Sequence, residues 1–539
     1  MKLSKKVKYG LFILLIILNL ILRYSVTHHE IFHDSFEMHI LANSLSEFGE
    51  ARWWVHPLGI IGMYPNSYAS AISFILSGIS QSTGLEVESV IFIYGLIFGL
   101  FCMFAGYIVA GEIYDDDLFK FLVAFGFSTC QGVLTYTTWT APARSPFIIL
   151  LPLFLYALLK SRKHHLRFGL ITIILALLLL ATHHLAFYLI PIFAACFLVT
   201  LVYKLKERIG VIKKVIKKSE NLMPLFIVFA FCLMLAYPFM THKFMTVGSR
   251  WYNLALVFNE YPRYIGILVF LAIGGFAYLV FKSNKRYEEW SLLTMLMFLC
   301  VFVFDEMYMK WFILIFAVLL AGVGLTNLNK LREDKEKKKH ATLVIVIFLL
   351  LSVSFSGYFQ FLHEYGTGFG GIERYMEDST YTTGLWIKEN MDGRGICNSR
   401  WIGWRIGATS GFPLLTGSSS NDQAYGFVDV REFELVKVPI TSEEFWIDSP
   451  YRRVKGTVSD GYWQLIMDKY YISAGYQYIP RFNITYLIED TRLHGYWISH
   501  RGYGPSPFVK VVHDDTNNCI YDSMNINIWC LNENNNRHS

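Results

Sequence analysis

The sequence predicts a polytopic α-helical membrane protein that carries a water-soluble, mixed α/β domain at its C-terminus. Three observations predict this fold class. The 539 residues are 54% hydrophobic and only 17% charged, with a mean hydropathy of +0.38, whereas soluble proteins carry about 25% charged residues. Long apolar runs fill residues 1–360, while residues 361–539 have the composition of an ordinary soluble domain. We therefore expect a transmembrane domain over 1–360 and a soluble domain over 361–539.

About eleven apolar runs reach or approach the roughly 20 residues that a membrane-spanning helix needs. They lie at residues 7–26, 89–110, 120–136, 147–160, 168–183, 186–203, 222–240, 263–281, 290–304, 311–327 and 341–359. The first run contains Arg23 and is followed by no small-residue cleavage site, so we interpret it as a retained helix rather than a signal peptide. A further stretch, residues 67–81, follows a proline and is rich in Ser and Gly. We expect it to form a helix that lies in the outer interface.

The basic residues indicate the orientation of the chain in the membrane. Lys and Arg cluster at the N-terminus and in four short loops, at residues 160–167, 204–218, 282–286 and 330–339. Such clusters mark the cytoplasmic side. With eleven spans, the N-terminus is cytoplasmic, the soluble domain is extracytoplasmic, and a first outer loop covers about residues 27–88. The same clustering explains the net charge of +6 by contact with membrane lipids and argues against nucleic acid as a partner.

Residues 33–39 concentrate ionisable side chains just past the first span, namely His33, Asp34, Glu37 and His39. If a helix begins here, Asp34 and Glu37 share one side of its first turns. Clustered carboxylates at a membrane surface can bind a divalent cation, and a single carboxylate can act as general base on an acceptor hydroxyl. The alternative is helix capping together with solvated charge. These four groups exceed what a cap needs, which favours a functional site.

Other ionisable residues on the predicted outer face add to this candidate site. Arg144 opens a span, and its planar guanidinium could pair two phosphate oxygens or reach the lipid headgroups; Arg250 is a weaker candidate of the same kind. His183 and His184 end another span, where ionisable residues mark either a polar cavity or the headgroup level. Glu306 lies in a tight outer turn, either solvated or completing the site begun by Asp34. No GxGxxG or GxxxxGK[ST] nucleotide fingerprint is present.

The layout of these features resembles the GT-C superfamily of membrane glycosyltransferases, in particular the archaeal and bacterial oligosaccharyltransferase catalytic subunits. The resembling features are the first span, the acidic loop 33–39, an interfacial helix after Tyr64-Pro65, and the entry 138–145 to a span rich in Leu and Pro. The body of eleven spans and the outer C-terminal domain also match. In that family the first-loop aspartate binds a metal or acts as the catalytic base, and the matching residue is Asp34.

Two departures from the family pattern affect what the resemblance implies. Oligosaccharyltransferases carry WWDYG, which reads the acceptor sequon, but residues 399–405 read Ser-Arg-Trp-Ile-Gly-Trp-Arg and lack the aspartate. They also carry a second acidic motif in the second outer loop, where this chain has Arg144 and no acid. Because of these departures, the resemblance does not by itself imply transfer to an Asn sequon or a metal requirement. A lipid, a glycan or a Ser/Thr hydroxyl is an acceptor at least as compatible with the sequence.

The sequence thus predicts a cell-envelope glycosyltransferase that moves a sugar or glycan from a polyprenyl- or dolichyl-phosphate donor to a glycan, lipid or protein acceptor, as in protein glycosylation. Asp34 and Glu37 are the predicted catalytic residues and the predicted ligands of a divalent cation, Mg²⁺ or Mn²⁺. Arg144 and Arg250 are predicted to bind the donor phosphate. The predicted supporting residues are His33, His39, His183, His184 and Glu306. The alternatives are a lipid-linked glycan transporter or flippase and a non-catalytic assembly protein. The chain shows no internal repeat and its ionisable groups gather at one face, which favours interfacial chemistry over transport.

Overall fold

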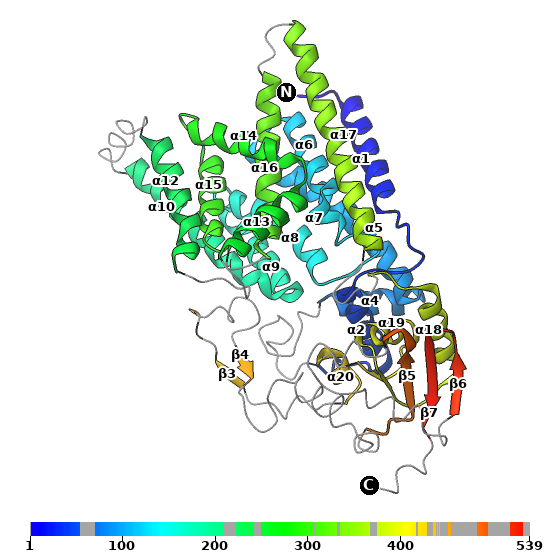
Figure 1. The fold of residues 1–539 in the computed structure, drawn as a ribbon. Coiled ribbons are helices and arrows are strands. Elements are labelled where there is room, and N and C mark those ends of the chain that lie inside the picture. The colour runs from blue at the N-terminus through cyan, green and yellow to red at the C-terminus, as the bar shows by residue number, and fades with distance from the viewer. Residues whose placement is uncertain are drawn as a thin grey trace.

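In the computed structural model of the protein, a bundle of helices stands against a small β-sheet, and the first helix begins at the end of the bundle away from the sheet (Figure 1). The structure describes residues 2–53, 71–208, 222–241, 250–304, 308–330, 335–366, 374–416, 419–427, 435–437, 439, 441, 451–453, 482–493 and 518–531. Of the predicted site residues, Glu306 lies outside the described residues, as does part of the first outer loop.

The bundle consists of apolar helices, as expected where no water is present to bond the backbone and every polar backbone group must pair within its own segment. Its elements are α1 (Lys5–Arg23), α5 (Val87–Ile113), α6 (Asp117–Thr129), α7 (Gln131–Leu134), α8 (Arg144–Ser161), α9 (His165–Thr182), η1 (His184–Tyr188), α10 (Leu189–Arg208), α12 (Met223–Thr241), α13 (Arg250–Ile265), α14 (Leu268–Phe281), α15 (Tyr287–Cys300), α16 (Met309–Lys330) and α17 (Lys335–Tyr365). Every one of the predicted apolar runs coincides with helical structure.

Among the described residues, six helices are long and apolar enough to cross a membrane, or up to seven if α13 and α14, bent by 96° at their junction, form one span. The remaining predicted runs fall short for visible reasons. A helix of 13 residues such as α6 is about 20 Å long, less than the hydrocarbon thickness of about 30 Å, and α1 carries charged residues at both ends. The polytopic architecture is confirmed, while the count of eleven spans stays a prediction.

Ion pairs place several predicted basic loops at one end of the bundle. Near the N-terminus, Lys2 pairs with Asp115 at 2.6 Å. Lys163, from the loop between α8 and α9, pairs with Glu112 at 2.9 Å, three residues before Asp115. Arg286 donates to the backbone oxygen of residue 113. The N-terminus and the basic loops 160–167 and 282–286 therefore share one end of the bundle, and the sheet lies at the other (Figure 1).

Two helices of the first outer loop lie between the bundle and the sheet. They are α2 (His33–Phe48) and α4 (Ala71–Thr83). Apolar side chains of α4, including Ile72 and Leu76, are buried in one cluster with Leu41 and Leu45 of α2 and Val90 of α5. A helix of 13 residues is too short to span. The predicted helix within residues 67–81 thus exists and packs on α2, and its depth in the membrane stays a prediction.

The C-terminal part is a mixed α/β domain. Its five-stranded sheet has the order β2-β1-β5-β7-β6, in which β1 is parallel to β2 and β5, and β7 is antiparallel to β5 and β6. A separate antiparallel pair joins β3 and β4. The elements are α18 (Asp378–Asn390), β1 (Gly395–Cys397), α19 (Arg400–Ser410), β2 (Leu414–Leu415), α20 (Ser419–Ala424), β3 (Leu435–Lys437), β4 (Tyr451–Arg453), β5 (Tyr486–Asp490), η5 (Thr491–Leu493), β6 (Asn518–Asp522) and β7 (Ile526–Cys530). The last helix of the bundle ends at Tyr365, so the predicted boundary at residue 360 falls within its final turns, and the division into domains stays a prediction.

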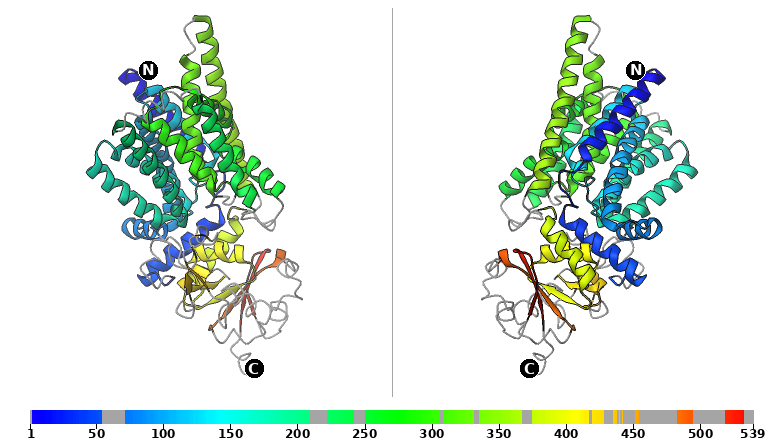
Figure 2. Two further views of the ribbon diagram at one scale, coloured as in Figure 1. Left: turned by 90° about the vertical axis from the view of Figure 1, so that its left-hand side faces the viewer. Right: turned by 90° about the vertical axis from the view of Figure 1, so that its right-hand side faces the viewer.

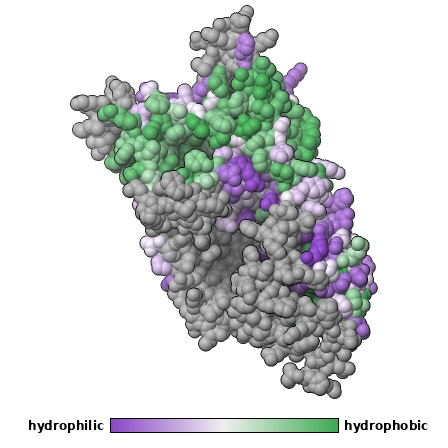
Figure 3. Space-filling view, viewed as in Figure 1, coloured by the Kyte–Doolittle hydropathy of each residue, from purple (hydrophilic) through white to green (hydrophobic). Residues whose placement is uncertain are grey.

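Helix α2 is shared between the two parts of the molecule. Phe36 and Ile40 are fully buried against Trp404 and Ala408 of α19, while Leu41 and Leu45 face α4. Figure 2 shows the blue helices α2 and α4 beneath the bundle and beside the yellow helices of the C-terminal domain. The hydrophobic surface of the bundle ends in a hydrophilic patch at this junction (Figure 3). The candidate site residues at the start of α2 therefore lie at the boundary between the apolar and polar parts of the molecule.

Candidate active site

Asp34 and Arg144 meet at the junction. Asp34 lies in the first turn of α2 and Arg144 opens α8, and Nη1 of the arginine donates to Oδ2 of the aspartate at 2.7 Å. The side chains are 38% and 17% exposed, respectively, so the pair is sheltered but remains open to solvent. The sequence predicts that these two residues share a site, and the structure brings them into direct contact.

The backbone around α2 fixes this contact. The amide of Ile31 donates to the oxygen of Trp139 at 3.1 Å, and the amide of Phe32 donates to the oxygen of Arg374 at 2.9 Å. Phe32 has a φ of 80°, which is uncommon for a residue with a side chain and turns the chain sharply into α2. Three segments, from the start of α2, the loop before α8 and the entry to the C-terminal domain, are thereby held side by side.

Aromatic rings surround the guanidinium of Arg144. Its Cζ atom lies 5.1 Å from the ring centroid of Tyr308, 5.0 Å from that of Trp311 and 5.9 Å from that of Tyr136. Cations gain energy over such ring faces, more so where water is excluded. The rings thus stabilise the positive charge of Arg144 without neutralising it.

Lys310 adds a second buried cation next to this arginine. Its Nζ donates to Glu260 of α13 at 3.0 Å and lies 4.3 Å from the ring centroid of Tyr264 and 5.8 Å from that of Trp311. Arg263 lies 3.6 Å from the same glutamate. Trp311 is therefore shared by Arg144 and Lys310, so that α8, α13 and α16 contribute to one basic cluster.

Further basic side chains approach from the C-terminal side. Arg374 donates to Nδ1 of His363 at 2.7 Å. Arg400 and Arg405 of α19 lie close enough to His33 to lower its pKa, together with Arg374. Positive groups from three regions of the chain therefore lie beside His33, the neighbour of Asp34 in the sequence, and such a field attracts an anion.

His33 lies between these cations and stays neutral. Its ring centroid is 3.9 Å from that of Trp401, and neither ring nitrogen has a hydrogen-bond partner within the described part of the chain. Burial, followed by the charges of Arg405, Arg374 and Arg400, lowers the pKa of His33 to about 3. A neutral imidazole with both nitrogens available can donate one hydrogen bond and accept another from a bound ligand.

The fold of this chain is similar to those of several solved membrane glycosyltransferases. No family model and no curated protein matches the sequence. The Archaeoglobus fulgidus oligosaccharyltransferase, tethered with an acceptor peptide that contains the NVT sequon, has a TM-score of 0.58 at 12% identity, over 91% of this chain and 70% of that chain. ArnT from Cupriavidus metallidurans has a TM-score of 0.55 at 9% identity, over 98% of this chain and 99% of that chain. Arabinofuranosyltransferase AftD from Mycobacteria has a TM-score of 0.50 at 12% identity, over 99% of this chain and 40% of that chain.

This chain has the GT-C fold. The fold named from the pattern of spans and loops is thereby confirmed for nearly the whole chain. Because GT-C proteins share an architecture and differ in their sites, the chemistry must be argued from the residues of this chain.

A divalent cation is the cofactor that the GT-C resemblance raises, and the Archaeoglobus oligosaccharyltransferase has also been solved in complex with zinc and sulfate. In this chain, no group of three or more His, Cys, Asp or Glu side chains within the described residues could hold a metal ion. One oxygen of Asp34 is already bound by the guanidinium of Arg144. The described donor set therefore does not fit the predicted Mg²⁺ or Mn²⁺ site of Asp34 and Glu37.

The remaining predicted residues of α2 are buried. Glu37 is buried, 4% exposed. Nδ1 of His39 lies 2.7 Å from Oε1 of the fully buried Glu30. Glu30 also accepts from Ser35 at 3.2 Å, and the Ser35 oxygen accepts from the amide of Ala141 at 2.9 Å. His39 therefore belongs to a buried network that fixes α2 against the loop before α8, and it supports Asp34 through the backbone.

His183 lies near the aromatic rings of the site. It is 5% exposed, its Nδ1 accepts from the amide of Leu185 at 3.1 Å, and its ring centroid is 6.4 Å from that of Trp311. It thus caps η1 and packs toward the ring that also contacts Arg144. His184 opens η1 and Arg250 opens α13, but their side chains are outside the described part of the structure, and their predicted roles stay predictions.

Sequence reasoning missed several members of the site. Glu260, Arg374 and the ring of Tyr264 were not singled out, and Lys310 was given no role in the site. A signal did exist for Glu260 and Lys310, since ionisable residues within or beside apolar helices usually pair and mark function. Arg374 offered no such signal, because its place depends on the backbone contact with residue 32.

Proposed function

We propose that this chain is a membrane glycosyltransferase that moves a sugar or glycan from a polyprenyl- or dolichyl-phosphate-linked donor to a glycan, lipid or protein acceptor. The observation that carries the proposal is the Asp34–Arg144 ion pair at 2.7 Å, set among aromatic rings and further cations where the bundle meets the C-terminal domain. The GT-C fold supports a glycosyltransferase in general. A lipid phosphate is supported by one structural neighbour, the Archaeoglobus oligosaccharyltransferase, which has been solved with dolichol-phosphate.

The ion pair provides both an anion-binding group and a base. A phosphate and a carboxylate are both oxyanions that a guanidinium binds through charge-assisted hydrogen bonds. The donor phosphate would therefore replace the Asp34 carboxylate at Arg144, and Lys310 and Arg374 would add positive charge beside it. Displacement leaves Asp34 free to accept a proton, so that binding of the donor itself prepares the base.

In the proposed step, an acceptor oxygen or nitrogen bonds to the anomeric carbon of the donor sugar. The bond from that carbon to the phosphate oxygen breaks, and its electron pair leaves with the phosphate, whose negative charge Arg144 stabilises. The proton of the acceptor passes to Asp34. General base assistance of this kind contributes roughly 10²–10⁴-fold to the rate. No step of this scheme uses a metal ion.

The orientation in the membrane is part of the proposal. Three basic segments share the end of the bundle opposite the sheet, and such segments favour the cytoplasmic side. The N-terminus would then be cytoplasmic, and the site and the C-terminal domain would be extracytoplasmic, where a lipid-linked donor presents its sugar.

The test uses purified full-length protein in lipid nanodiscs with a set of radiolabelled polyprenyl-phosphate sugars. Wild-type protein should transfer label to an acceptor, and Asp34→Asn should lose at least about 100-fold of that rate while retaining its melting temperature. Asp378→Asn, a change of the same kind at a side chain that is 72% exposed, is the matched control and should be fully active. Near-normal transfer by Asp34→Asn would reject the assigned base. In sealed proteoliposomes, movement of intact donor across the bilayer without transfer would favour a flippase instead.

A further inference from the structure

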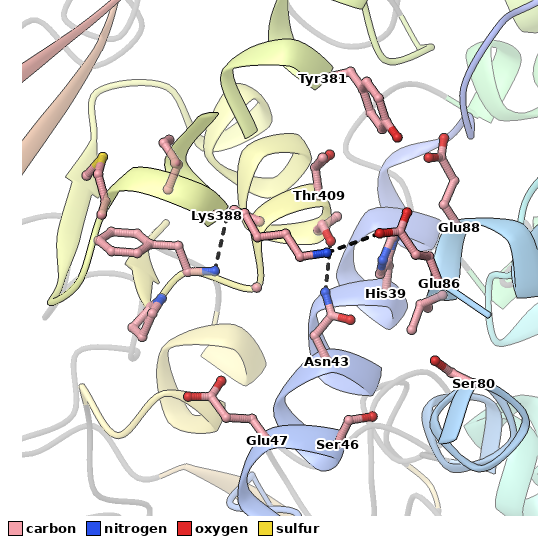
Figure 4. A pocket seen from close by; sticks show the side chains of 18 of the residues that line it. His39, Asn43, Ser46, Glu47, Ser80, Glu86, Glu88, Tyr381, Lys388 and Thr409 are labelled. Atoms are coloured by element: carbon pink, nitrogen blue, oxygen red, sulfur yellow. Dashed lines mark hydrogen bonds and ion pairs between the residues drawn. The ribbon is translucent and has the colours of Figure 1, made fainter. Parts of the chain in front are cut away.

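A second site lies on the other side of α2. A cavity of about 780 Å³ is formed between the first outer loop and the C-terminal domain. Its walls are α2, the end of α4 with the turn into α5, α18, and the end of α19 with residues 411–413. Figure 4 shows Asn43, Ser46 and Glu47 along one side of α2, with Lys388 reaching across from α18 toward Glu86. The volume lies within the range of about 300–1,000 Å³ that small-molecule sites occupy.

The cavity is separate from the Asp34–Arg144 pair. His39, which lines it, follows Asp34 by five positions, which is about 7.5 Å along the helix axis and about 140° around it. The buried Glu30 bonds both His39 and Ser35, the residue that follows Asp34. One helix and one hydrogen-bond network thus separate the two sites and hold them in fixed relation.

The charge of the cavity is opposite to that of the basic cluster. Four carboxylates line it, those of Glu47, Glu86, Glu88 and Asp392, against the single lysine Lys388. The lysine is already paired with Glu86 at 3.1 Å. A phosphate placed here would face like charges, which disfavour binding. The donor phosphate therefore belongs at Arg144, and the cavity suits a ligand without negative charge.

The other lining groups indicate what that ligand is. Hydroxyl and amide side chains line the cavity beside the carboxylates, among them Asn43, Ser46, Gln81, Thr409 and Ser410. Carboxylates accept hydrogen bonds, amides and hydroxyls both donate and accept them, and a saccharide hydroxyl can satisfy either kind of partner. Tyr381 and Leu85 add apolar surface that fits the carbon face of a sugar ring. We propose that this cavity binds an uncharged saccharide, the part of the acceptor remote from the hydroxyl that reacts at Asp34.

The identification of this saccharide as the acceptor rests on the proposed function, but saccharide binding itself can be measured without turnover. Binding energy from a remote part of a substrate can be used to orient the reacting group. A saccharide held between the first outer loop and the C-terminal domain is placed beside the helix that carries Asp34. The cavity therefore assigns a neutral glycan as the acceptor class, rather than an anionic lipid or an acidic peptide.

The experiment measures equilibrium binding by titration calorimetry on wild-type protein in nanodiscs. The probes are cellotetraose, maltotetraose and N-acetylchitotetraose as neutral saccharides, and tetragalacturonate as the anionic counterpart. At least one neutral probe should bind saturably, and tetragalacturonate should not. Glu47→Lys should weaken binding by about tenfold or more, and Ser46→Phe should weaken it by occupying the cavity. Both positions are exposed on α2, so neither change disturbs a core.

Two controls make the result specific. Glu50→Lys makes the same charge change just beyond α2, at a side chain that is 72% exposed and does not line the cavity, and should bind as wild type does. Arg144→Ala should keep saccharide binding, because Arg144 contacts the other side of α2. Absence of binding by every neutral probe, preference for tetragalacturonate, or equal losses in Glu47→Lys and Glu50→Lys would overturn the proposal. Saccharide binding without sugar transfer from any donor would refute the proposed function and leave the cavity assignment standing.

Discussion

The indole ring of Trp401 lies against the imidazole ring of His33, with the two centroids 3.9 Å apart. His33 precedes Asp34 at the start of α2, and Trp401 belongs to α19 of the C-terminal domain. The C-terminal domain therefore supplies part of the immediate surroundings of the candidate base. A substitution in that domain can reach the site by direct contact, without any rearrangement of the bundle.

This packing predicts a measurable effect of pH on stability. The pKa of His33 is lowered to about 3 by burial and by nearby arginines, against an ordinary value of about 6.5. Below pH 6.5 the unfolded chain binds a proton at this residue that the folded chain does not bind. The contribution of His33 to the free energy of unfolding is thus fully present above pH 6.5 and decreases as the pH falls toward 3, by at most about 1.4 kcal/mol per pH unit.

The comparison is between wild type and His33→Phe, with melting temperatures measured at pH 7 and pH 5. The wild type should lose more stability over this interval than His33→Phe does, because phenylalanine fills the space and takes up no proton. His28→Phe, at a side chain that is 79% exposed, should follow the wild type. Identical pH dependence in wild type and His33→Phe would contradict the neutral, buried state of His33.

The role of Arg144 in binding the donor phosphate should depend on the shape of its guanidinium as well as on its charge. Lysine keeps the charge but loses the planar fork that pairs two phosphate oxygens. We expect kcat/KM for the lipid-linked donor to fall about 10- to 100-fold in Arg144→Ala, as for the loss of a charged hydrogen bond, and to fall less in Arg144→Lys. Arg167→Lys, beyond the other end of α8, serves as control and should leave kcat/KM unchanged. Full activity of Arg144→Ala would remove this residue from the site.

The pair of Lys310 and Glu260 should show strong coupling. Removing one partner of a buried ion pair costs about 3–5 kcal/mol, whereas replacing both by neutral groups of similar size is often tolerated. Lys310→Met alone should therefore lower the melting temperature, and Lys310→Met combined with Glu260→Gln should recover much of it. Because Lys310 lies beside the ring that also contacts Arg144, the double variant should still bind donor more weakly than wild type. Recovery of donor affinity along with stability would show that the pair has a structural role only.

Much of this architecture could be predicted from the sequence, because its signals are local. Apolar runs predicted the helices, and the carboxylates and histidines of residues 33–39 together with Arg144 predicted the centre of the candidate site. Other features depend on tertiary contacts. The involvement of Arg374 follows from a backbone hydrogen bond to Phe32, and the ring of Trp401 reaches His33 only because α19 packs on α2. The sequence also could not predict whether these residues fit a metal ion, since that depends on Asp34 facing a guanidinium rather than another acid.

Gly99 should be intolerant of any side chain, for a reason that involves the same site. The space beside it on α5 is occupied by the guanidinium of Arg23, which is 1% exposed and donates to Thr137 Oγ1 at 2.9 Å and to the backbone oxygen of Ser128 at 2.9 Å. Thr137 lies in the segment that leads to Arg144. A valine at position 99 would push Arg23 from its acceptors and leave buried polar groups unsatisfied.

We expect Gly99→Val to lower the free energy of unfolding by about 1–3 kcal/mol, as overpacking does in other cores, and to reduce transfer in proportion to the displacement of the segment before α8. Gly274→Val is the matched control, because a Cβ atom added at that glycine meets nothing within 4 Å. Thermal unfolding of both variants in nanodiscs gives the comparison. If Gly99→Val had the same melting temperature as Gly274→Val and the wild type, Arg23 would not be fixed against α5. Its hydrogen bonds could then not be fixing the segment that leads to Arg144.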